Sequence, residues 1–387
     1  MKRLFLALSL MAASGCSTVK PETVKPLPAG QPAQEQPSSA SPIPYRQEVV
    51  ARGLDVPWAI DLAPDGRIFF TERPGHLRVV DNNGKLLDDP AISFEAPFVS
   101  EGEGGLLGVA LDPQFQENHY LYVYHSYKDN SQLKNRVLRL VERDNKARVD
   151  KVLIDTIPGA GIHNGGRLKI GPDGCLYITT GDAHQPGLAQ DRSSLAGKIL
   201  RIRLDGSIPA DNPFPGSPIY SLGHRNPQGL AWQPESGSLY SSEHGQSAHD
   251  EINRIQIGFN YGWPLIQGDK TRPNPEEPGG ALLAPLLHSG EATWAPSGMT
   301  FLTKGPWKGQ LLVANLRGRQ LLKLELNKGS NGEASLKVET ILKEQYGRLR
   351  DVLEAPDGSI YLLTNNRDGR GQAQAGDDRI IRFRPDF

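Results

Sequence analysis

The chain has 387 residues, a formal net charge of −1 and 37% hydrophobic residues, which is the composition of an ordinary globular protein. It has no excess of basic residues, so we expect no bulk nucleic-acid partner. The 42 glycines and 31 prolines, with 7% aromatic residues, indicate many turns between short strands rather than long helices.

Residues 1–15 have the pattern of an export signal. Lys2 and Arg3 precede an apolar stretch, and small residues precede Cys16. The ending "ASGC" resembles the lipobox of bacterial lipoproteins, although Ala13 stands where that pattern more often has leucine. The resemblance implies cleavage before Cys16 and its diacylation, and Ser17 favours the outer membrane with the folded domain in the periplasm. A plain signal peptide cleaved nearby is the alternative.

Residues 16–44 are rich in Pro, Ser, Gln and Ala. Such a segment cannot bury enough apolar surface to fold, which predicts a disordered tether. No apolar run after residue 16 is long enough to span a membrane, so a lipid on Cys16 would be the only membrane anchor. The second cysteine, Cys175, sits in the apolar strand pattern "GCLYITTG" and is predicted to be a buried structural thiol.

One phrase recurs through residues 45–387, a turn built on Pro-Asp-Gly or a relative followed by an alternating apolar strand. The copies lie near Pro64, Pro113, Pro172, Pro234, Pro306 and Pro356. Proline presets the turn, aspartate caps it and glycine accepts a positive φ, while the flanking residues alternate as in a strand. Six such units, roughly fifty to seventy residues apart, predict an all-β, six-bladed β-propeller. The terminal "DDRIIRFRPDF" is expected to pair with the first blade and close the ring.

Acidic residues gather in "SSEHGQSAHDEIN", where Glu243, Asp250 and Glu251 surround a glycine turn. Carboxylates next to free backbone carbonyls suit a hard cation such as Ca²⁺, and a solvated acidic loop is the other interpretation. The following "GFNYGWP" is predicted to be a tight loop that could add a backbone ligand.

Arginines recur at other strand ends. In "HRNPQG", Arg225 and Asn226 precede a proline, so the chain is extended and both side chains can project. Further arginines occur in "ANLRGRQ" and in "GRLRDV", and several converging guanidinium groups would bind carboxylates. The glycines of "GEGGLLG" and "HNGGR" would allow a flat or bulky group close to the backbone. With His163, this set suits a planar polyanionic cofactor and Ca²⁺.

Two common active-site motifs are absent from the sequence. It contains no G-x-S-x-G nucleophile elbow and no G-x-G-x-x-G opening a helix, so a serine hydrolase and a nicotinamide-binding Rossmann site are not expected.

The segments "LDVPWAIDLAPDGRIFFTER", "GEGGLLGVALDPQF", "HNGGRLKIGPDG", "GHRNPQGLAW", "NYGWP" and "RLRDVLEAPDGSIYLLT" resemble the soluble PQQ-dependent sugar dehydrogenases, in the right order and over almost the whole folded chain. The likeness is greatest to the bacterial aldose sugar dehydrogenase branch, which is related to glucose/sorbosone dehydrogenases. The resemblance implies oxidation of the anomeric carbon of an aldose to a lactone, with PQQ and calcium as cofactors and a quinone or cytochrome as electron acceptor.

The resemblance also implies roles for individual residues. His163 would be the general base, Asp182 would orient it, and Arg225 would lie near the quinone oxygens of PQQ. Trp294 would border the sugar. The expected further PQQ contacts are Glu103, Asn226, Asn315, Arg317, Arg348 and Arg350. The expected calcium ligands are the carbonyls of Gly245 and Gln246 for the cofactor ion, and Glu251 with the Tyr261 carbonyl for a structural ion.

Three positions depart from the family pattern. Glu103 replaces a glutamine that contacts the cofactor, Arg317 replaces a frequent lysine, and Gln246 replaces a frequent proline. Two alternatives to the dehydrogenase stay open at this stage. One is a calcium-dependent propeller lactonase, which would need a metal site lined mainly by Glu, Asp and Asn, and the other is a propeller that binds a glycan or a protein without catalysis.

Overall fold

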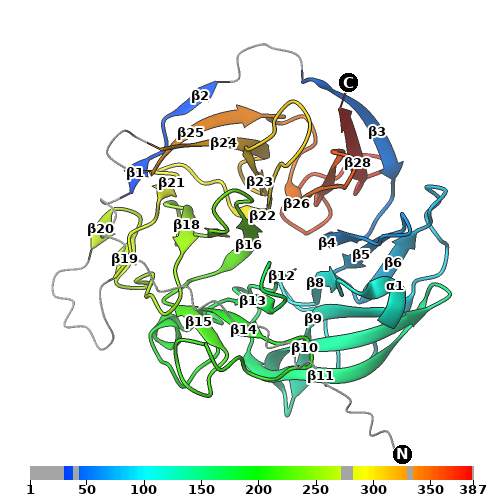
Figure 1. Cartoon of the computed structure of the whole chain (residues 1–387), viewed down its shortest axis with the longest axis horizontal. Helices are drawn as coiled ribbons and strands as arrows, with labels where there is room; N and C mark the ends of the chain where they lie inside the picture. The colour runs from blue at the N-terminus through cyan, green and yellow to red at the C-terminus, as the bar shows by residue number, and fades with distance from the viewer. Residues whose placement is uncertain (1–29, 38–42, 272–281, 329–333, 386–387) are drawn as a thin grey trace, which may run out of the picture.

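The computed structural model describes residues 30–37, 43–271, 282–328 and 334–385. In this part of the chain, six sheets stand side by side around an axis (Figure 1). This arrangement confirms the predicted all-β, six-bladed β-propeller.

Each blade contains four antiparallel strands, the first of which lies nearest the axis (Figure 1). In blades one to three these are β4 (Pro57–Leu62), β5 (Ile68–Glu72), β6 (His76–Val80) and β7 (Ile92–Ser93); β8 (Leu106–Leu111), β9 (Tyr120–Asp129), β10 (Gln132–Arg143) and β11 (Lys146–Pro158); and β12 (Leu168–Ile170), β13 (Leu176–Thr180), β14 (Lys198–Ile202) and β15 (Ile219–Leu222). In blades four to six they are β16 (Pro227–Trp232), β17 (Leu239–Glu243), β18 (Glu251–Ile255) and β21 (Leu287–His288); β22 (Pro296–Phe301), β23 (Leu311–Asn315), β24 (Gln320–Lys328) and β25 (Ala334–Ile341); and β26 (Leu349–Glu354), β27 (Ile360–Thr364), β28 (Ile380–Pro385) and β3 (Tyr45–Ala51).

The repeated phrase has the same place in every blade. Each of the six turns connects the innermost strand of a blade to the next strand outward. In three of them glycine adopts a positive φ and donates its N–H to the residue three positions earlier, as Gly66 does to Ala63, Gly174 to Gly171 and Gly358 to Ala355. The turn residues recognised in the sequence therefore mark the position of each blade along the chain.

Both ends of the propeller domain meet in the sixth blade. The C-terminal strand β28 pairs antiparallel with β3, for example Phe383 with Gln47, and β3 is the outermost strand of that blade. The expected ring closure is therefore present, but the partner strand belongs to the last blade rather than the first. Because β3 covers the outer edge of β28, that edge is not left open.

Part of the predicted tether pairs with the propeller. Gln31–Pro32 form β1, which adds in parallel to β21, and Glu35–Pro37 form β2, which adds in parallel to β25. The backbone N–H of Ala33 also donates to the His288 carbonyl at 2.8 Å. The prediction of disorder over residues 16–44 is therefore wrong for this short stretch, because backbone pairing does not require apolar side chains. The rest of the predicted signal and most of the tether lie outside the described residues.

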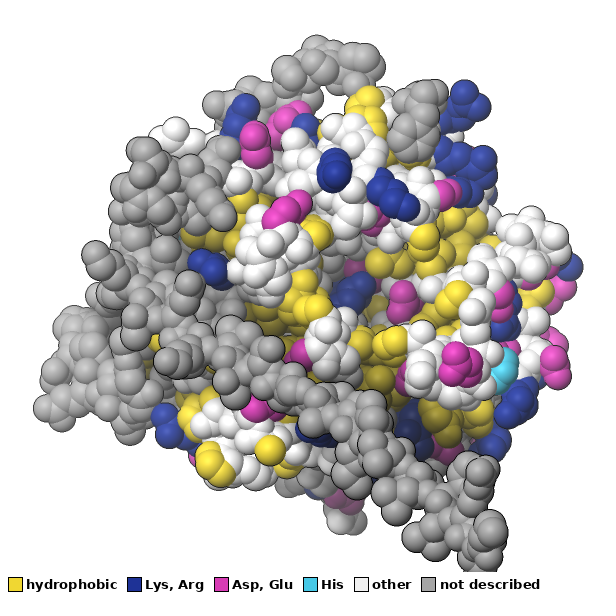
Figure 2. Space-filling model, viewed as in Figure 1, with side chains coloured by type: hydrophobic (Ala, Val, Ile, Leu, Met, Phe, Trp, Pro, Cys, Tyr) yellow, Lys and Arg dark blue, Asp and Glu magenta, His cyan; other side chains and the backbone are white. Residues whose placement is uncertain are grey.

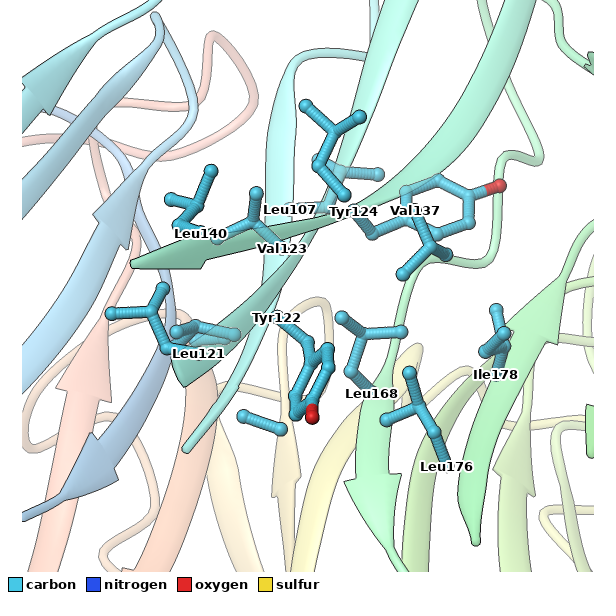
Figure 3. Packing of buried hydrophobic residues seen from close by; sticks show 14 of the residues in the cluster. Leu107, Leu121, Tyr122, Val123, Tyr124, Val137, Leu140, Leu168, Leu176 and Ile178 are labelled. Carbon is cyan, nitrogen blue, oxygen red and sulfur yellow. The ribbon is translucent and has the colours of Figure 1, made fainter. Parts of the chain in front are cut away.

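Apolar side chains fill the space between neighbouring blades. Leu107 of β8 and Tyr122 of β9 belong to one buried cluster with Leu168 of β12 and Leu176 of β13 (Figure 3). Cys175 is 5% exposed and unpaired in a second cluster, in agreement with its predicted structural role. On the face shown in Figure 2, basic and acidic side chains both occur near the centre of the ring.

Helix is confined to short segments among the described residues. The α-helix α1 (Phe115–Asn118) and the 3₁₀ segment η1 (Pro186–Ala189) each have four residues. A small hairpin of β19 (Ile266–Gln267) and β20 (Lys270–Thr271) lies outside the blades. In this part of the chain no helix has the length and hydropathy of a membrane span.

Candidate functional site

The antiparallel blades bring most of the predicted site residues to one end of the propeller. The start of an innermost strand and the end of the next strand outward lie at the same edge of each sheet. The residues at the starts are Glu103, His163, Arg225, Asn226, Arg348 and Arg350, and those at the ends are Arg73, Asp182, Gly245, Asn315 and Asp368.

His163 and Asp182 form a buried pair. The Nδ1 atom of His163 lies 2.7 Å from Oδ1 of Asp182, and the two residues are 8% and 0% exposed. A carboxylate can only accept, so Nδ1 carries the proton and Nε2 is left as an acceptor. The second carboxylate oxygen, Oδ2, accepts the indole N–H of Trp263 at 2.8 Å. The arrangement fixes the tautomer and the direction of a histidine that can take up a proton.

The loop around His163 is held from both sides. His163 itself has a φ of +60°, an unusual conformation for a residue other than glycine. Its backbone N–H donates to Oε2 of Glu103 at 3.0 Å. On the second blade, the Tyr124 hydroxyl donates to the Asn164 carbonyl at 2.8 Å and the Asn135 amide donates to Oδ1 of Asn164 at 3.0 Å. The base therefore stands on a rigid loop.

Glu103 supports this loop and pairs with an arginine on another blade. Its Oε1 accepts Nη1 of Arg370 at 2.5 Å. Burial alone would raise the pKa of Glu103, but the His163 N–H and the Arg370 guanidinium outweigh it and lower the pKa to about 2. A carboxylate at this position is therefore ionised and already occupied by two donors.

A cavity of about 200 Å³ opens beside this loop, and three arginines line it together with Trp58, Glu103, Gln228, His244 and Asp368. Arg350 donates to Oε1 of Gln228 and to Oδ1 of Asn365, which are both neutral groups. Burial, with neighbouring arginines, lowers the pKa of Arg350 to about 9 although the Asp368 charge opposes this. Burial also lowers the pKa of Arg73. Such weakly compensated cations suit an anionic ligand.

A second cavity of about 440 Å³ is lined by Arg317, Arg319, Arg348, Arg370 and Arg379 together with Glu344 and Asp377. The predicted cofactor residues Arg317 and Arg348 are here, while Arg350 lines the first cavity. Arg348 donates from Nε and Nη2 to Oδ2 of Asp368 at 2.9 and 2.6 Å. Arg370 lines both cavities, so the two adjoin at this side chain.

Arg225 and Asn226 lie on the opposite side of the His163 loop from Glu103. Oδ1 of Asn226 accepts the Gly165 N–H at 2.9 Å, and the Arg225 guanidinium lies 5.3 Å from the Trp263 ring. Burial lowers the pKa of Arg225, against the opposing charges of Asp182 and Glu243. Within the described residues, Nε of Arg225, Nδ2 of Asn226 and Nε of Arg73 are buried without a hydrogen-bond partner.

Three of the four predicted metal residues, Gly245, Glu251 and Tyr261, line a small cavity of about 10 Å³ together with Arg225, Glu243, His249 and Trp263. Burial and the neighbouring Glu243 carboxylate raise the pKa of Glu251 to about 8. Gln246 is exposed and does not line this cavity. Among the described residues no three Asp, Glu, His or Cys side chains converge as ligands, so a cation here would need backbone carbonyls.

The acidic loop is not a solvated one. Glu243 bonds the His224 ring at 2.9 Å and accepts the Arg225 N–H, and Asp250 accepts the N–H groups of Gly245 and Trp294 at 2.9 and 2.6 Å. Both carboxylates are therefore fully engaged in holding the loop.

Two further predictions differ from the structure. Trp294 is 1% exposed in the apolar cluster between blades four and five, so it does not stand at the predicted place beside the sugar. Asn315 is buried at the end of β23 and lines none of these cavities. The backbone N–H of Trp294 donates to Asp250, and this bond holds the chain where the Trp294 side chain enters the core.

The glycines of "HNGGR" also have another explanation. A Cβ on Gly165 would meet the Thr179 carbonyl oxygen at 2.6 Å, and a Cβ on Gly166 would meet Leu107 at 2.6 Å. The two residues have φ values of +63° and +101°. Packing between strands and blades therefore already requires glycine here.

Arg73, Asp368, Arg370 and Trp263 are among the site residues that were not predicted from the sequence. Arg73 directly follows β5 in "FFTERP", so the rule that flagged other strand-end arginines could have found it. Asp368 and Arg370 lie in a loop after β27. Arg370 reaches Glu103 on blade two, and no local signal in the sequence indicates this approach.

Comparison with known proteins agrees with this geometry. The family model "Glucose / Sorbosone dehydrogenase" matches residues 54–380. The chain belongs to the glucose/sorbosone dehydrogenase family. It is 34% identical over 353 residues to the aldose sugar dehydrogenase YliI of Escherichia coli, covering 85% of this chain and 92% of that protein.

Solved structures of the same family superpose on the propeller. The PQQ-bound form of aldose sugar dehydrogenase from Streptomyces coelicolor is 36% identical, with a TM-score of 0.76 over 89% of this chain and 99% of that one. An oxidoreductase described as a glucose dehydrogenase, from Thermus thermophilus, is 42% identical with a TM-score of 0.78 over 88% and 99% of the two chains. The family expected from the sequence motifs is therefore confirmed.

Proposed function

We propose that this glucose/sorbosone dehydrogenase family member is a PQQ- and calcium-dependent aldose dehydrogenase that oxidises the anomeric carbon of a sugar to a lactone. The observation that supports it most is that the loop carrying His163, the partner of Asp182, contributes Asn164 and Gly165 to the wall of a cavity lined by arginines. A base and a polyanion site at one end of one propeller suit this reaction. The lactonase alternative required a cavity lined mainly by Glu, Asp and Asn, and the cationic lining argues against it.

The residues present fit the cofactor. PQQ carries several carboxylates, and the buried Arg350 and the half-buried Arg73 and Arg225 have no hydrogen-bonded carboxylate partner among the described residues. The unpaired Nδ2 of Asn226 adds a neutral donor. When bound, PQQ would supply a quinone that takes up the hydride, which carries the two electrons lost by the sugar. Arg317 and Arg348 in the adjoining cavity are the further candidates to hold its charges.

The protein's own contribution is acid–base chemistry and positioning. Loss of a hydride from the anomeric carbon requires that the hydroxyl on that carbon also loses its proton. Nε2 of His163 is the free acceptor for this proton, because Nδ1 is bonded to Asp182. Asp182 stabilises the imidazolium that forms, and Trp263 and the Glu103-supported loop hold both groups in place.

Glu251 and the small cavity beside it fit a calcium ion. A buried carboxylate next to another carboxylate is costly, and the raised pKa of Glu251 reflects that cost. A divalent cation would offset it as the structural ion, with oxygen ligands from Glu251 and the backbone of Tyr261. The separate cofactor ion, with the Gly245 carbonyl as a ligand, would supply a Lewis acid for a quinone oxygen.

Reconstitution tests the proposed function. The protein, freed of residues 1–15, is mixed with PQQ and Ca²⁺, and reduction of a dye is followed with a panel of aldoses. The matched variant is His163→Asn, because asparagine tolerates the positive φ of this position. We expect activity that needs PQQ and Ca²⁺ and that falls at least about hundredfold in the variant. Absence of both PQQ binding and dye reduction with every aldose would reject the proposal.

We also propose export and anchoring of the protein at the cell envelope, with the catalytic domain in the periplasm and a quinone or cytochrome as electron acceptor. The support is the signal-like segment ending at Cys16 and the tether that follows it. Incorporation of labelled fatty acid that is lost in Cys16→Ser, together with fractionation of the envelope, tests the anchor. An unlabelled, freely released periplasmic protein would favour the plain signal peptide.

A further inference from the structure

Trp263 is the buried residue whose indole holds Asp182 in the proposed reaction. It lies in "NYGWP", is 7% exposed, and its indole Nε1–H donates to Oδ2 of Asp182 at 2.8 Å. The other oxygen, Oδ1, bonds Nδ1 of His163 at 2.7 Å and accepts the His184 N–H at 2.8 Å. Both oxygens of Asp182 therefore have hydrogen-bond partners, and the indole is the side-chain donor that holds Oδ2.

The backbone of Trp263 is clamped between the third and fourth blades. Its N–H donates to the Gly223 carbonyl at 2.9 Å, and its carbonyl accepts Nε2 of Gln190 at 2.6 Å. Gln190 also donates to Oδ1 of Asn260 at 3.2 Å and accepts from its amide at 2.7 Å. These bonds fix the backbone position from which the indole reaches Asp182.

The same residue reaches the small cavity assigned to calcium. Trp263 lines that cavity together with Glu251 and Tyr261, and it is two residues from Tyr261 in the chain. Its ring also lies 5.3 Å from the Arg225 guanidinium. One side chain thus forms part of the cavity wall and, through Asp182, holds the base.

We propose that Trp263 is a positioning residue that couples occupancy of the Glu251 cavity to the orientation of His163. The coupling runs through three bonded groups, the Trp263 indole, the Asp182 carboxylate and the His163 imidazole. An ion that orders the Tyr261–Trp263 segment fixes the indole, which fixes the plane of the carboxylate and with it the ring. This inference rests on the proposed function, but its structural part can be measured without PQQ or sugar.

The kinetic test uses Trp263→Phe, which keeps an aromatic ring but removes the indole N–H together with part of the ring volume. We expect kcat for the aldose to fall about tenfold or more, because a hydrogen bond to a charged group is lost. KM for the sugar and the affinity for PQQ should change by less than about threefold. The matched control is Trp307→Phe, a buried tryptophan packed on Tyr45 away from the site, which should leave kcat unchanged. An unchanged kcat in Trp263→Phe overturns the positioning role.

The second test is NMR of the cofactor-free full chain during titration with CaCl₂. We expect the His163 Nδ1 proton and the Trp263 Nε1 proton to shift with one common midpoint, and the His163 response to disappear in Trp263→Phe. His163→Asn assigns the first signal. A calcium titration that moves neither proton in the wild-type chain overturns the coupling, even if the Phe variant does not fold. If the protein oxidises no aldose, the proposed function fails while this measurement still decides the coupling.

Discussion

The Glu103 carboxylate accepts the backbone N–H of His163 at 3.0 Å and so holds a residue whose φ is +60°. The second oxygen of the same carboxylate is bonded to Arg370, on a loop of the sixth blade. Glu103 therefore connects the loop of the base to the far wall of the cavity. This relationship explains how a carboxylate can replace glutamine beside an anionic cofactor, since its charge faces Arg370 and the backbone.

The first prediction concerns acid stability and Glu103. Its folded pKa of about 2 lies below the ordinary 4.5, so its stabilisation is present above pH 4.5 and is lost as the pH falls toward 2. We expect Glu103→Gln to lower the free energy of unfolding by at most about 3 kcal/mol at pH 7, since solvent around the exposed Arg370 weakens the pair. Urea unfolding at several pH values measures the difference.

The two chains should converge in stability as the pH approaches 2. Glu101→Gln is the control, because Glu101 pairs with Lys128 at an exposed position and should have a small effect at every pH. A difference between Glu103→Gln and wild type that stays constant from pH 7 to pH 2 would contradict the ionised, bonded carboxylate.

The second prediction separates chemistry from binding at Asp182. In Asp182→Asn the amide cannot accept at both former oxygens, so the histidine loses its fixed tautomer. We expect kcat to fall about hundredfold or more, with PQQ affinity within about threefold of wild type. Stopped-flow dye reduction and a PQQ titration measure the two quantities. Asp191→Asn, on an exposed turn, is the matched control. A loss confined to PQQ affinity would assign Asp182 to the cofactor instead.

The fold could be predicted from the sequence because the blade signal is local. A Pro-Asp-Gly turn between two alternating segments determines where a strand pair lies, as at Pro172 between β12 and β13. The same logic places His163 before one strand and Asp182 after the next, so their proximity follows from the blade. The Arg348–Asp368 pair follows the same rule in blade six. The Glu103–Arg370 pair depends instead on the path of one loop from blade six to blade two, which no short pattern encodes.

The third prediction concerns Arg350 and the conflict between stability and binding. Its guanidinium is buried with neutral partners, and a buried cation without a paired carboxylate is costly. We expect Arg350→Gln to leave the melting temperature of the cofactor-free protein unchanged or higher. The increase in melting temperature caused by PQQ should shrink markedly, because affinity falls at least about tenfold.

Differential scanning fluorimetry with and without PQQ measures both effects. Arg382→Gln serves as the control, since Arg382 pairs with Asp357 on the outer part of the sixth blade and should not alter the response to PQQ. A cofactor-free Arg350→Gln protein that melts several degrees lower while keeping the full PQQ response would make Arg350 a structural residue only.

The fourth prediction concerns calcium and Glu251. Removal of Ca²⁺ with a chelator should lower the melting temperature of the wild-type protein, because an ion that binds only the folded state stabilises it. In Glu251→Gln this response should be lost, and the metal-free variant should be at least as stable as metal-free wild type, since it lacks a buried carboxylate beside Glu243. Glu235→Gln, at an exposed turn, should respond to calcium as wild type does. A full calcium response in Glu251→Gln would place the ion elsewhere.

The last prediction concerns residues 30–37, where the expectation of a free tether was wrong. The pairing of β1 with β21 and of β2 with β25 uses backbone groups of two exposed sheet edges, so composition gave no sign of it. A chain that begins at residue 43 should melt a few degrees lower than one that begins at residue 30, and it should self-associate more, because both edges lose their cover. Its kcat should be unchanged, since the site lies at the strand ends near the axis. Equal melting temperature and equal sedimentation for the two chains would mean that these strands add nothing to the fold.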